Sequence, residues 1–226
     1  MATHQLFHFI IPKNKPMIKH SKNRLESLSD AVFAFAATLM VVNLGANADF
    51  SSLKEELPMF ISFGISFFVM IALWKLHYNF FRRTKYVDNW IIAYNTFFLF
   101  MILFYVFPLK SLATAVILKT RMSITELSEL FQLYSVGFSL IFLCLVLMYK
   151  RAYKKDTKNE NPLILQFYKR HFFIFVLVGL ISSVLAYFQL GIKFGLPGII
   201  YSILGLLCYI HSKTFHKKYP QNNLFS

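Results

Sequence analysis

Residues 24–44 form a segment that is almost wholly apolar from Leu28 to Val42 but carries polar side chains at critical places. Arg24 stands at its start, Asp30 lies about two helical turns from that start, and Thr38 lies near the middle. A helix of this length can cross a bilayer. A single helix, however, cannot shield these polar groups from lipid, so they must face other helices or water. The segment therefore predicts a bundle of helices within a membrane.

Composition agrees with this prediction. The chain has 226 residues, of which 57% are hydrophobic, and it contains 27 Phe. Charged residues make up 15%, against about 25% in a soluble domain. A soluble chain of this length could not bury so many large apolar side chains, and several apolar runs reach membrane-spanning length. We expect an integral, multi-pass membrane protein of the all-α class.

Six transmembrane helices are expected, at about residues 24–44, 57–81, 89–109, 126–148, 171–190 and 196–212. A basic segment, 1–23, precedes this domain of residues 24–212, and a short basic tail, 213–226, follows it. Pro108 is expected to kink or end the third helix, which leaves 110–118 as a short separate piece. Ser123 and Glu126 have the spacing of a capping box, and Asn161 precedes a proline at a first helical position.

The loops differ in positive charge. Those expected on the side of the termini hold 18 Lys and Arg, and those on the other side hold 4. Because positive residues stay in the cytoplasm, both termini should be cytoplasmic. The net charge of +14 is explained by this topology and by attraction to anionic lipid. The bilayer is thus an expected partner, and nucleic acid is not.

Six polar-capable residues on three helices share one depth near the cytoplasmic side in this topology. They are Arg24, Ser29 and Asp30 of the first helix, Trp74 and His77 of the second, and Asn95 of the third. In hydrocarbon, such groups are satisfied by bonding to one another. We therefore expect a structural polar network that joins the first three helices.

A helical wheel separates two faces of the first helix. One carries a carboxylate followed by small residues, suited to close packing on a neighbour: Asp30, Ala34, Ala37 and Val41. The other is an apolar stripe with a hydroxyl: Ala31, Phe35, Thr38 and Val42, with Leu39 at its edge. A stripe of this kind is compatible with lining a narrow path.

Each of these residues also has a simpler interpretation. Arg24 could be an interfacial anchor, and Trp74 could belong to an aromatic belt. His77 could be a structural histidine, and Thr38 could bond to its own helix backbone. Asp30 is harder to explain as structural alone, because ionisable groups at this depth are costly and usually functional or paired.

Two motifs and two single residues of the first three helices stand out: Arg24-x-x-x-Leu28-Ser29-Asp30, Trp74-x-x-His77-x-x-x-Phe81, Asn95 and Pro108. In these residues the chain resembles the transmembrane protein 175 family of potassium channels, in its prokaryotic form with six helices. Leu28 stands where the family signature has phenylalanine. Phe35 replaces the usual branched aliphatic residue, and Tyr78 stands where many members have a second histidine.

The resemblance implies a homotetrameric, potassium-selective leak channel in a prokaryotic plasma membrane, with K+ as the permeant ion and no cofactor. The first helix would line the pore, with apolar rings at Phe35, Leu39 and Val42 and a hydroxyl ring at Thr38. Ala31 would lie on the same stripe. The signature's polar residues would hold the first helix against the second and third.

The sequence also bears on function classes other than a potassium channel. The carbonyl-filter sequence TVGYG is absent, so any selectivity must come from side-chain rings. A proton-conducting channel or a small-cation secondary transporter is the alternative, because Asp30 and His77 could form part of a relay. Enzyme motifs such as HExxH and GxSxG are absent, so we expect no enzyme. A structural or assembly protein remains open.

Overall fold

The computed structural model describes residues 21–42, 50–118 and 122–220, and every regular element in these ranges is helical. In chain order the longer helices are α1 (Lys22–Val42), α2 (Phe50–Arg83), α3 (Asn89–Ile117), α4 (Ile124–Lys155) and α5 (Pro162–Tyr187). The last part comprises η1 (Ile192–Phe194), α6 (Leu196–Ile199), η2 (Ile200–Ser202) and α7 (Ile203–Lys218).

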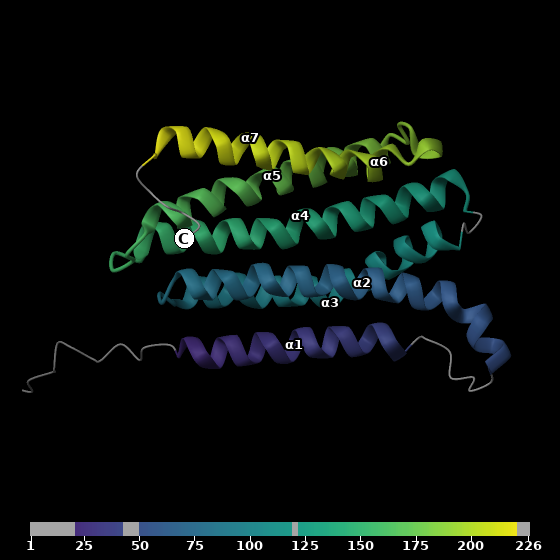
Figure 1. Ribbon diagram of the computed structural model, residues 1–226, viewed down its shortest axis with the longest axis horizontal. Coiled ribbons are helices and arrows are strands. Elements are labelled where there is room, and N and C mark those ends of the chain that lie inside the picture. The colour runs from purple at the N-terminus through teal and green to yellow at the C-terminus, as the bar shows by residue number, and fades with distance from the viewer. Residues whose placement is uncertain (1–20, 43–49, 119–121, 221–226) are drawn as a thin grey trace, which may run out of the picture.

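The long helices lie roughly parallel or antiparallel in an elongated bundle (Figure 1). α1 lies at one edge and packs on α2 and α3, α4 lies between α3 and α5, and α7 lies at the opposite edge against α5. α1 is therefore an edge helix, with one face on the bundle and the other open.

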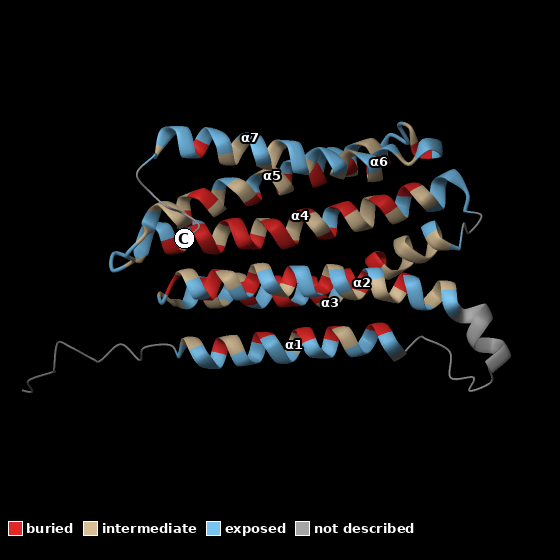
Figure 2. Ribbon diagram, viewed as in Figure 1, coloured by how far each residue is buried: buried red, intermediate tan, exposed pale blue. Residues whose placement is uncertain are grey.

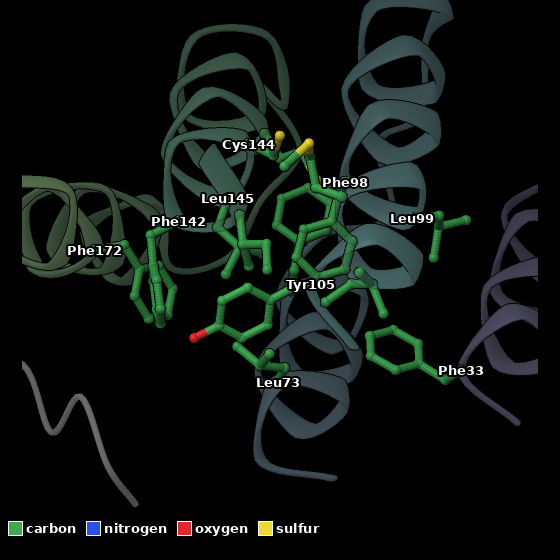
Figure 3. Packing of buried hydrophobic residues seen from close by; sticks show 14 of the residues in the cluster. Phe33, Leu73, Phe98, Leu99, Tyr105, Phe142, Cys144, Leu145 and Phe172 are labelled. Atoms are coloured by element: carbon green, nitrogen blue, oxygen red, sulfur yellow. The ribbon is translucent and has the colours of Figure 1, made fainter. Parts of the chain in front are cut away.

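The core is continuous from α1 to α5. Figure 3 shows Phe33 of α1 at one end of a buried cluster, with Phe142 of α4 and Phe172 of α5 at the other. Tyr105 of α3 lies between them and is 1% exposed. α3 and α4 supply most of the buried side chains, so these two helices form the centre of the packing.

The outer surface is apolar as well. Phe68 is 73% exposed and Phe107 is 71% exposed, and large exposed hydrophobic residues occur on every long helix. Apolar patches of this extent are not stable against water and mark a surface that contacts lipid or protein. This surface is expected of a protein whose solvent is the bilayer.

Five described stretches are long and apolar enough to cross a membrane: Leu57–Arg83, Asn89–Ile117, Ile124–Lys155, Pro162–Tyr187 and Leu196–Lys218. α1 is not among them, because its first half carries Lys22, Arg24, Glu26 and Asp30. Together these findings establish an integral, multi-pass helical protein. A crossing by α1 stays a prediction, as does the direction of the termini.

The prediction that Pro108 could end the third helix is wrong. α3 continues through Pro108 to Ile117, so residues 110–118 are not a separate piece. A proline removes one backbone hydrogen bond, but Pro108 and Leu109 are both buried in the bundle. This packing favours continuation of the helix.

Two helix starts follow the sequence signals. The capping box predicted at Ser123 is present, with its hydroxyl accepting from the Glu126 amide at 3.2 Å and the Glu126 carboxylate accepting from the Ser123 amide at 2.8 Å. α5 begins at Pro162 with Asn161 at the N-cap, as that dipeptide predicted, although the Asn161 side chain makes no capping hydrogen bond. The helices extend beyond several of the expected membrane ranges, because helical structure continues into the connections.

Candidate functional site

Three buried polar side chains join α1, α2 and α3. The Ser29 hydroxyl donates to the Leu25 carbonyl at 2.7 Å, and Asn95 Nδ2 lies 3.1 Å from Ser29 Oγ. His77 Nε2 lies 2.6 Å from Asn95 Oδ1. Ser29 and Asn95 are fully buried and His77 is nearly so. This chain of contacts satisfies the polar groups away from water.

The directions of these bonds follow from the donors available. Because the Ser29 hydrogen is used on a backbone carbonyl, Ser29 Oγ must accept from the Asn95 amide nitrogen. That contact turns Asn95 Oδ1 toward His77. An amide oxygen only accepts, so His77 must carry its hydrogen on Nε2. The network assigns one tautomer to the histidine.

Aromatic rings surround His77. Its ring stacks on Phe98 at 5.1 Å between centroids, and Phe81 meets it edge-on at 5.0 Å. Phe33 of α1 lies 5.7 Å away. These contacts fix the imidazole in place and make it part of the joint between α1 and its neighbours.

Asp30 and Trp74 form a second link between α1 and α2. Trp74 Nε1 donates to Asp30 Oδ1 at 2.8 Å, and the indole stacks on Tyr78 at 5.4 Å between ring centroids. Asp30 is exposed, unlike Ser29. A small cavity of about 260 Å³ lies beside it and is lined also by Glu26 and His77.

Arg24 stands apart from these two links. Its side chain is exposed, and within the described residues its guanidinium makes neither a hydrogen bond nor an ion pair with the other five residues of the expected network. The structure thus brings together Ser29, His77 and Asn95, and separately Asp30 and Trp74, but leaves Arg24 outside both.

The two faces of α1 differ sharply in burial. The face toward α2 and α3 carries Leu25, Ser29, Phe33, Ala36 and Met40, all of them buried. In Figure 2 the buried positions of α1 lie on the side that faces the bundle and the exposed positions lie on the far side. The first helix therefore has one anchored face and one free face.

The expected path-lining residues lie on the free face. Phe35 is 57% exposed and Leu39 is 38% exposed, and Ala31 and Thr38 are exposed too. The Thr38 hydroxyl donates to the Phe35 carbonyl at 2.7 Å. The side chain of Val42 lies outside the described part of the structure.

The small-residue face was expected to pack on a neighbouring helix. Within this chain most of that face stays open, apart from the hydrogen bond between Asp30 and Trp74. Asp30, Ala34 and Val41 are exposed, and Ala37 is only partly buried. The helical wheel gave the angular positions of the residues around α1, but it could not show which side of the helix faces the bundle. The signal that could have identified the anchored face is its repeat of positions 25, 29, 33, 36 and 40, which includes the large side chains Phe33 and Met40.

Two further contacts were not anticipated from the sequence. Lys110 Nζ donates to the Met40 carbonyl at 3.2 Å, so α3 supplies a cation near the C-terminal end of α1. At the opposite end of the bundle, Arg151 donates to Asp88 Oδ2 from Nε at 2.7 Å, and its Nη2 lies 2.6 Å from the same oxygen. Neither pair has a local sequence spacing that indicates it.

Asp88 also caps α3 through the Ile91 amide at 2.9 Å and accepts from the Tyr86 hydroxyl at 3.0 Å. Partial burial disfavours its charge. The hydrogen bonds from Ile91, Arg151 and Tyr86 outweigh this effect and hold the pKa of Asp88 below its usual value. Burial and the nearby carboxylate raise the pKa of Tyr86 in turn.

Within the described ranges, no group of three or more His, Cys, Asp or Glu side chains could hold a metal ion. The arrangement instead anchors one face of an edge helix and presents its other face. Fold and site thus define an integral helical membrane protein with a braced first helix.

The comparisons identify what this protein resembles. The family model described as the endosomal/lysosomal potassium channel TMEM175 matches residues 24–105, which cover α1, α2 and most of α3. The chain resembles this family of channels, as its signature residues predicted. The match covers the part of the chain that holds both hydrogen-bonded links.

Individual relatives and solved structures that the chain matches are also named as potassium channels. A potassium channel of Marivirga tractuosa is 36% identical over 151 residues, which are 60% of this chain and 61% of the relative. The alignment thus spans less than two thirds of that relative. A crystal structure of the potassium channel MtTMEM175, as a threonine-to-alanine variant bound to a nanobody–MBP fusion, has a TM-score of 0.74 at 27% identity and covers 88% of this chain and 96% of its own.

The crystal structure of a lysosomal potassium-selective channel TMEM175 homologue from Chamaesiphon minutus has a TM-score of 0.57. It covers 81% of this chain and 97% of its own at 20% identity, and at this level the likeness concerns the fold alone.

Proposed function

We propose that the protein is a potassium-selective leak channel in which four copies of the chain place α1 around one axis. The observation that carries this proposal is the division of α1 into a braced face and an exposed face. An edge helix held rigidly by its own subunit can present the same stripe to a shared path in every copy. We propose potassium as the conducted ion because the similar proteins are named potassium channels.

The exposed stripe has the side chains that such a path requires. Phe35 and Leu39 would form apolar rings that narrow the path and could close it by dewetting. Thr38 donates its only hydroxyl hydrogen to its own helix, so its oxygen lone pairs are available to a cation. A ring of four such oxygens would replace part of the hydration shell of K+.

The polar links have a separate task in this proposal. Ser29, Asn95 and His77 fix the rotation of α1 about its own axis, because a rotated helix would lose their hydrogen bonds. Asp30 and Trp74 fix its position along α2. In the proposed topology, with both termini cytoplasmic, these links lie at the cytoplasmic end and do not touch the ion in its constriction.

Cysteine accessibility tests whether Phe35 lines the path. In a background with Cys144→Ser and Cys208→Ser, Phe35→Cys should make ion flux in liposomes sensitive to a water-soluble, bulky thiol reagent. The matched control is Phe173→Cys, because Phe173 is similarly exposed, at 48%, but lies on α5. Flux that is blocked equally in both variants, or in neither, would contradict the pore assignment.

A proton path is the second candidate, and the cavity beside Asp30 is the observation that favours it. This cavity brings Glu26, Asp30 and His77 to a common space of about 260 Å³. A pH-sensitive dye inside the same liposomes separates the two functions. Proton entry without potassium flux, abolished by Asp30→Asn, would favour the proton path over the potassium channel.

A further inference from the structure

The connections α2–α3 and α4–α5 enclose a basic cavity at the end of the bundle. The cavity measures about 860 Å³ and is lined by five cationic side chains, Arg82, Arg83, Lys85, Lys155 and Lys158. Only two acidic side chains, Asp156 and Glu160, lie among them. A positive excess of this kind favours an anionic ligand.

One of the two acidic side chains, Asp156, accepts hydrogen bonds from residues of both connections. Asp156 Oδ2 accepts from the Thr84 hydroxyl at 2.6 Å and from Asn159 Nδ2 at 3.1 Å. Asn159 Nδ2 also lies 2.7 Å from the Arg83 carbonyl. Asp156 therefore holds the two connections together. Both of its donors are uncharged, and the five cationic side chains of the cavity outnumber its two carboxylates.

Arg83 is held in a defined place at the wall of the cavity. Its Nη1 donates to the Tyr149 hydroxyl at 2.9 Å, and its guanidinium carbon lies 3.7 Å from the centroid of the Tyr168 ring. This stacking leaves the remaining N–H groups available to a ligand, in the rigid fork that suits phosphate oxygens. The cavity thus has a preorganised cation beside flexible lysines.

The position of the cavity in the bundle indicates which type of anion it would bind. Arg82 and Arg83 end α2, Lys155 ends α4, and α5 begins next to the cavity without a capping hydrogen bond from Asn161. The cations therefore lie where membrane helices end, at the level of lipid headgroups. The positive end of the α5 dipole adds to the field.

We propose that this cavity between the α2–α3 and α4–α5 connections binds the phosphodiester headgroup of an anionic phospholipid. A bound headgroup would bridge the α2–α3 connection to the α4–α5 connection, and so link the α1–α3 part of the bundle to α4 and α5. The site is separate from the exposed face of α1, so the proposal does not depend on which ion the protein conducts.

Lipid titration tests the proposal on the full-length protein purified in detergent. Fluorescent phosphatidylglycerol should bind more tightly than the matching phosphatidylcholine. Lys85→Gln combined with Lys158→Gln should weaken phosphatidylglycerol binding about tenfold or more, since each basic residue near the headgroup contributes to the attraction. Lys85→Arg combined with Lys158→Arg should retain the original affinity.

The matched control removes two positive charges outside the cavity. Lys217→Gln with Lys218→Gln neutralises exposed lysines at the same end of the bundle, near the end of α7, and should change the affinity by no more than about twofold (Figure 1). An equal loss in both double variants would overturn the proposal in favour of diffuse surface attraction. Displacement of the lipid by inorganic phosphate at the same concentration would overturn the assignment to a lipid.

Discussion

His77 Nε2 lies 2.6 Å from Asn95 Oδ1, and this contact joins α2 to α3 inside a ring of aromatic side chains. Asn95 contacts Ser29 of α1 with its other amide atom. One side chain on α3 thereby sets the positions of both neighbouring helices.

Asn95→Leu should destabilise the protein by about 1–3 kcal/mol, because it preserves side-chain size but leaves the buried His77 N–H without an acceptor. Thermal unfolding in detergent measures the effect. Thr96→Val is the matched control, since Thr96 is the next residue, is exposed, and bonds only the Ile92 carbonyl of its own helix. Equal stability of the two variants would show that the joint contributes little.

Asp88 should make stability depend on acidic pH. Its pKa in the folded protein lies below the ordinary value of 3.8, so its contribution is complete above that value and is lost as the pH falls through the folded pKa. Asp88→Asn should therefore be less stable than the wild type at pH 7, by about 1 kcal/mol, because asparagine caps a helix as well as aspartate does but cannot form the ion pair with Arg151. Melting temperatures from pH 7 to pH 3 should converge; a constant gap would contradict this account.

Thr38→Ala should lower the ratio of potassium to sodium flux without affecting the fold. The hydroxyl contacts only its own helix backbone, so its removal leaves no buried group unpaired. Thr38→Ser keeps an oxygen at the same position and should retain the ratio. An unchanged ratio in Thr38→Ala would remove the threonine ring from the selectivity mechanism.

Asp30→Ala should mainly impair assembly. The change removes the hydrogen bond to Trp74 and frees α1 to shift along α2, at a cost of about 0.5–1.5 kcal/mol per subunit. Light scattering after size-exclusion chromatography should show a smaller tetramer fraction. If the tetramer instead stays intact while its ion selectivity changes, Asp30 acts on the ion and this account of its role is wrong.

The fold class was predictable because membrane helices are marked by long apolar runs, and the helix start at Ser123 follows from local hydrogen bonding. The end of α3 was not predictable from the sequence, because burial of Pro108 depends on helices distant in sequence. Hydropathy gives the tendency of a segment to be helical, and tertiary packing decides where it stops.

The α1 polar residues were recognisable because buried polar groups in hydrocarbon require partners. Which of these residues bond to one another was not predictable, since that depends on how each helix is rotated about its axis. The wheel placed Phe35 and Thr38 on one stripe, whereas the anchored face with Phe33 became visible only with α2 and α3 in place. The Arg151–Asp88 pair lacks any sequence signal, because its partners lie 63 residues apart.

The most direct test of the central claim is the rate of potassium and sodium flux through the wild-type protein in liposomes. If the proposal is right, folded tetramers should pass potassium faster than sodium, because the exposed stripe of α1 would narrow the path and offer Thr38 oxygens to the ion. Equal rates for the two ions, or no flux from a folded tetramer, would contradict the claim.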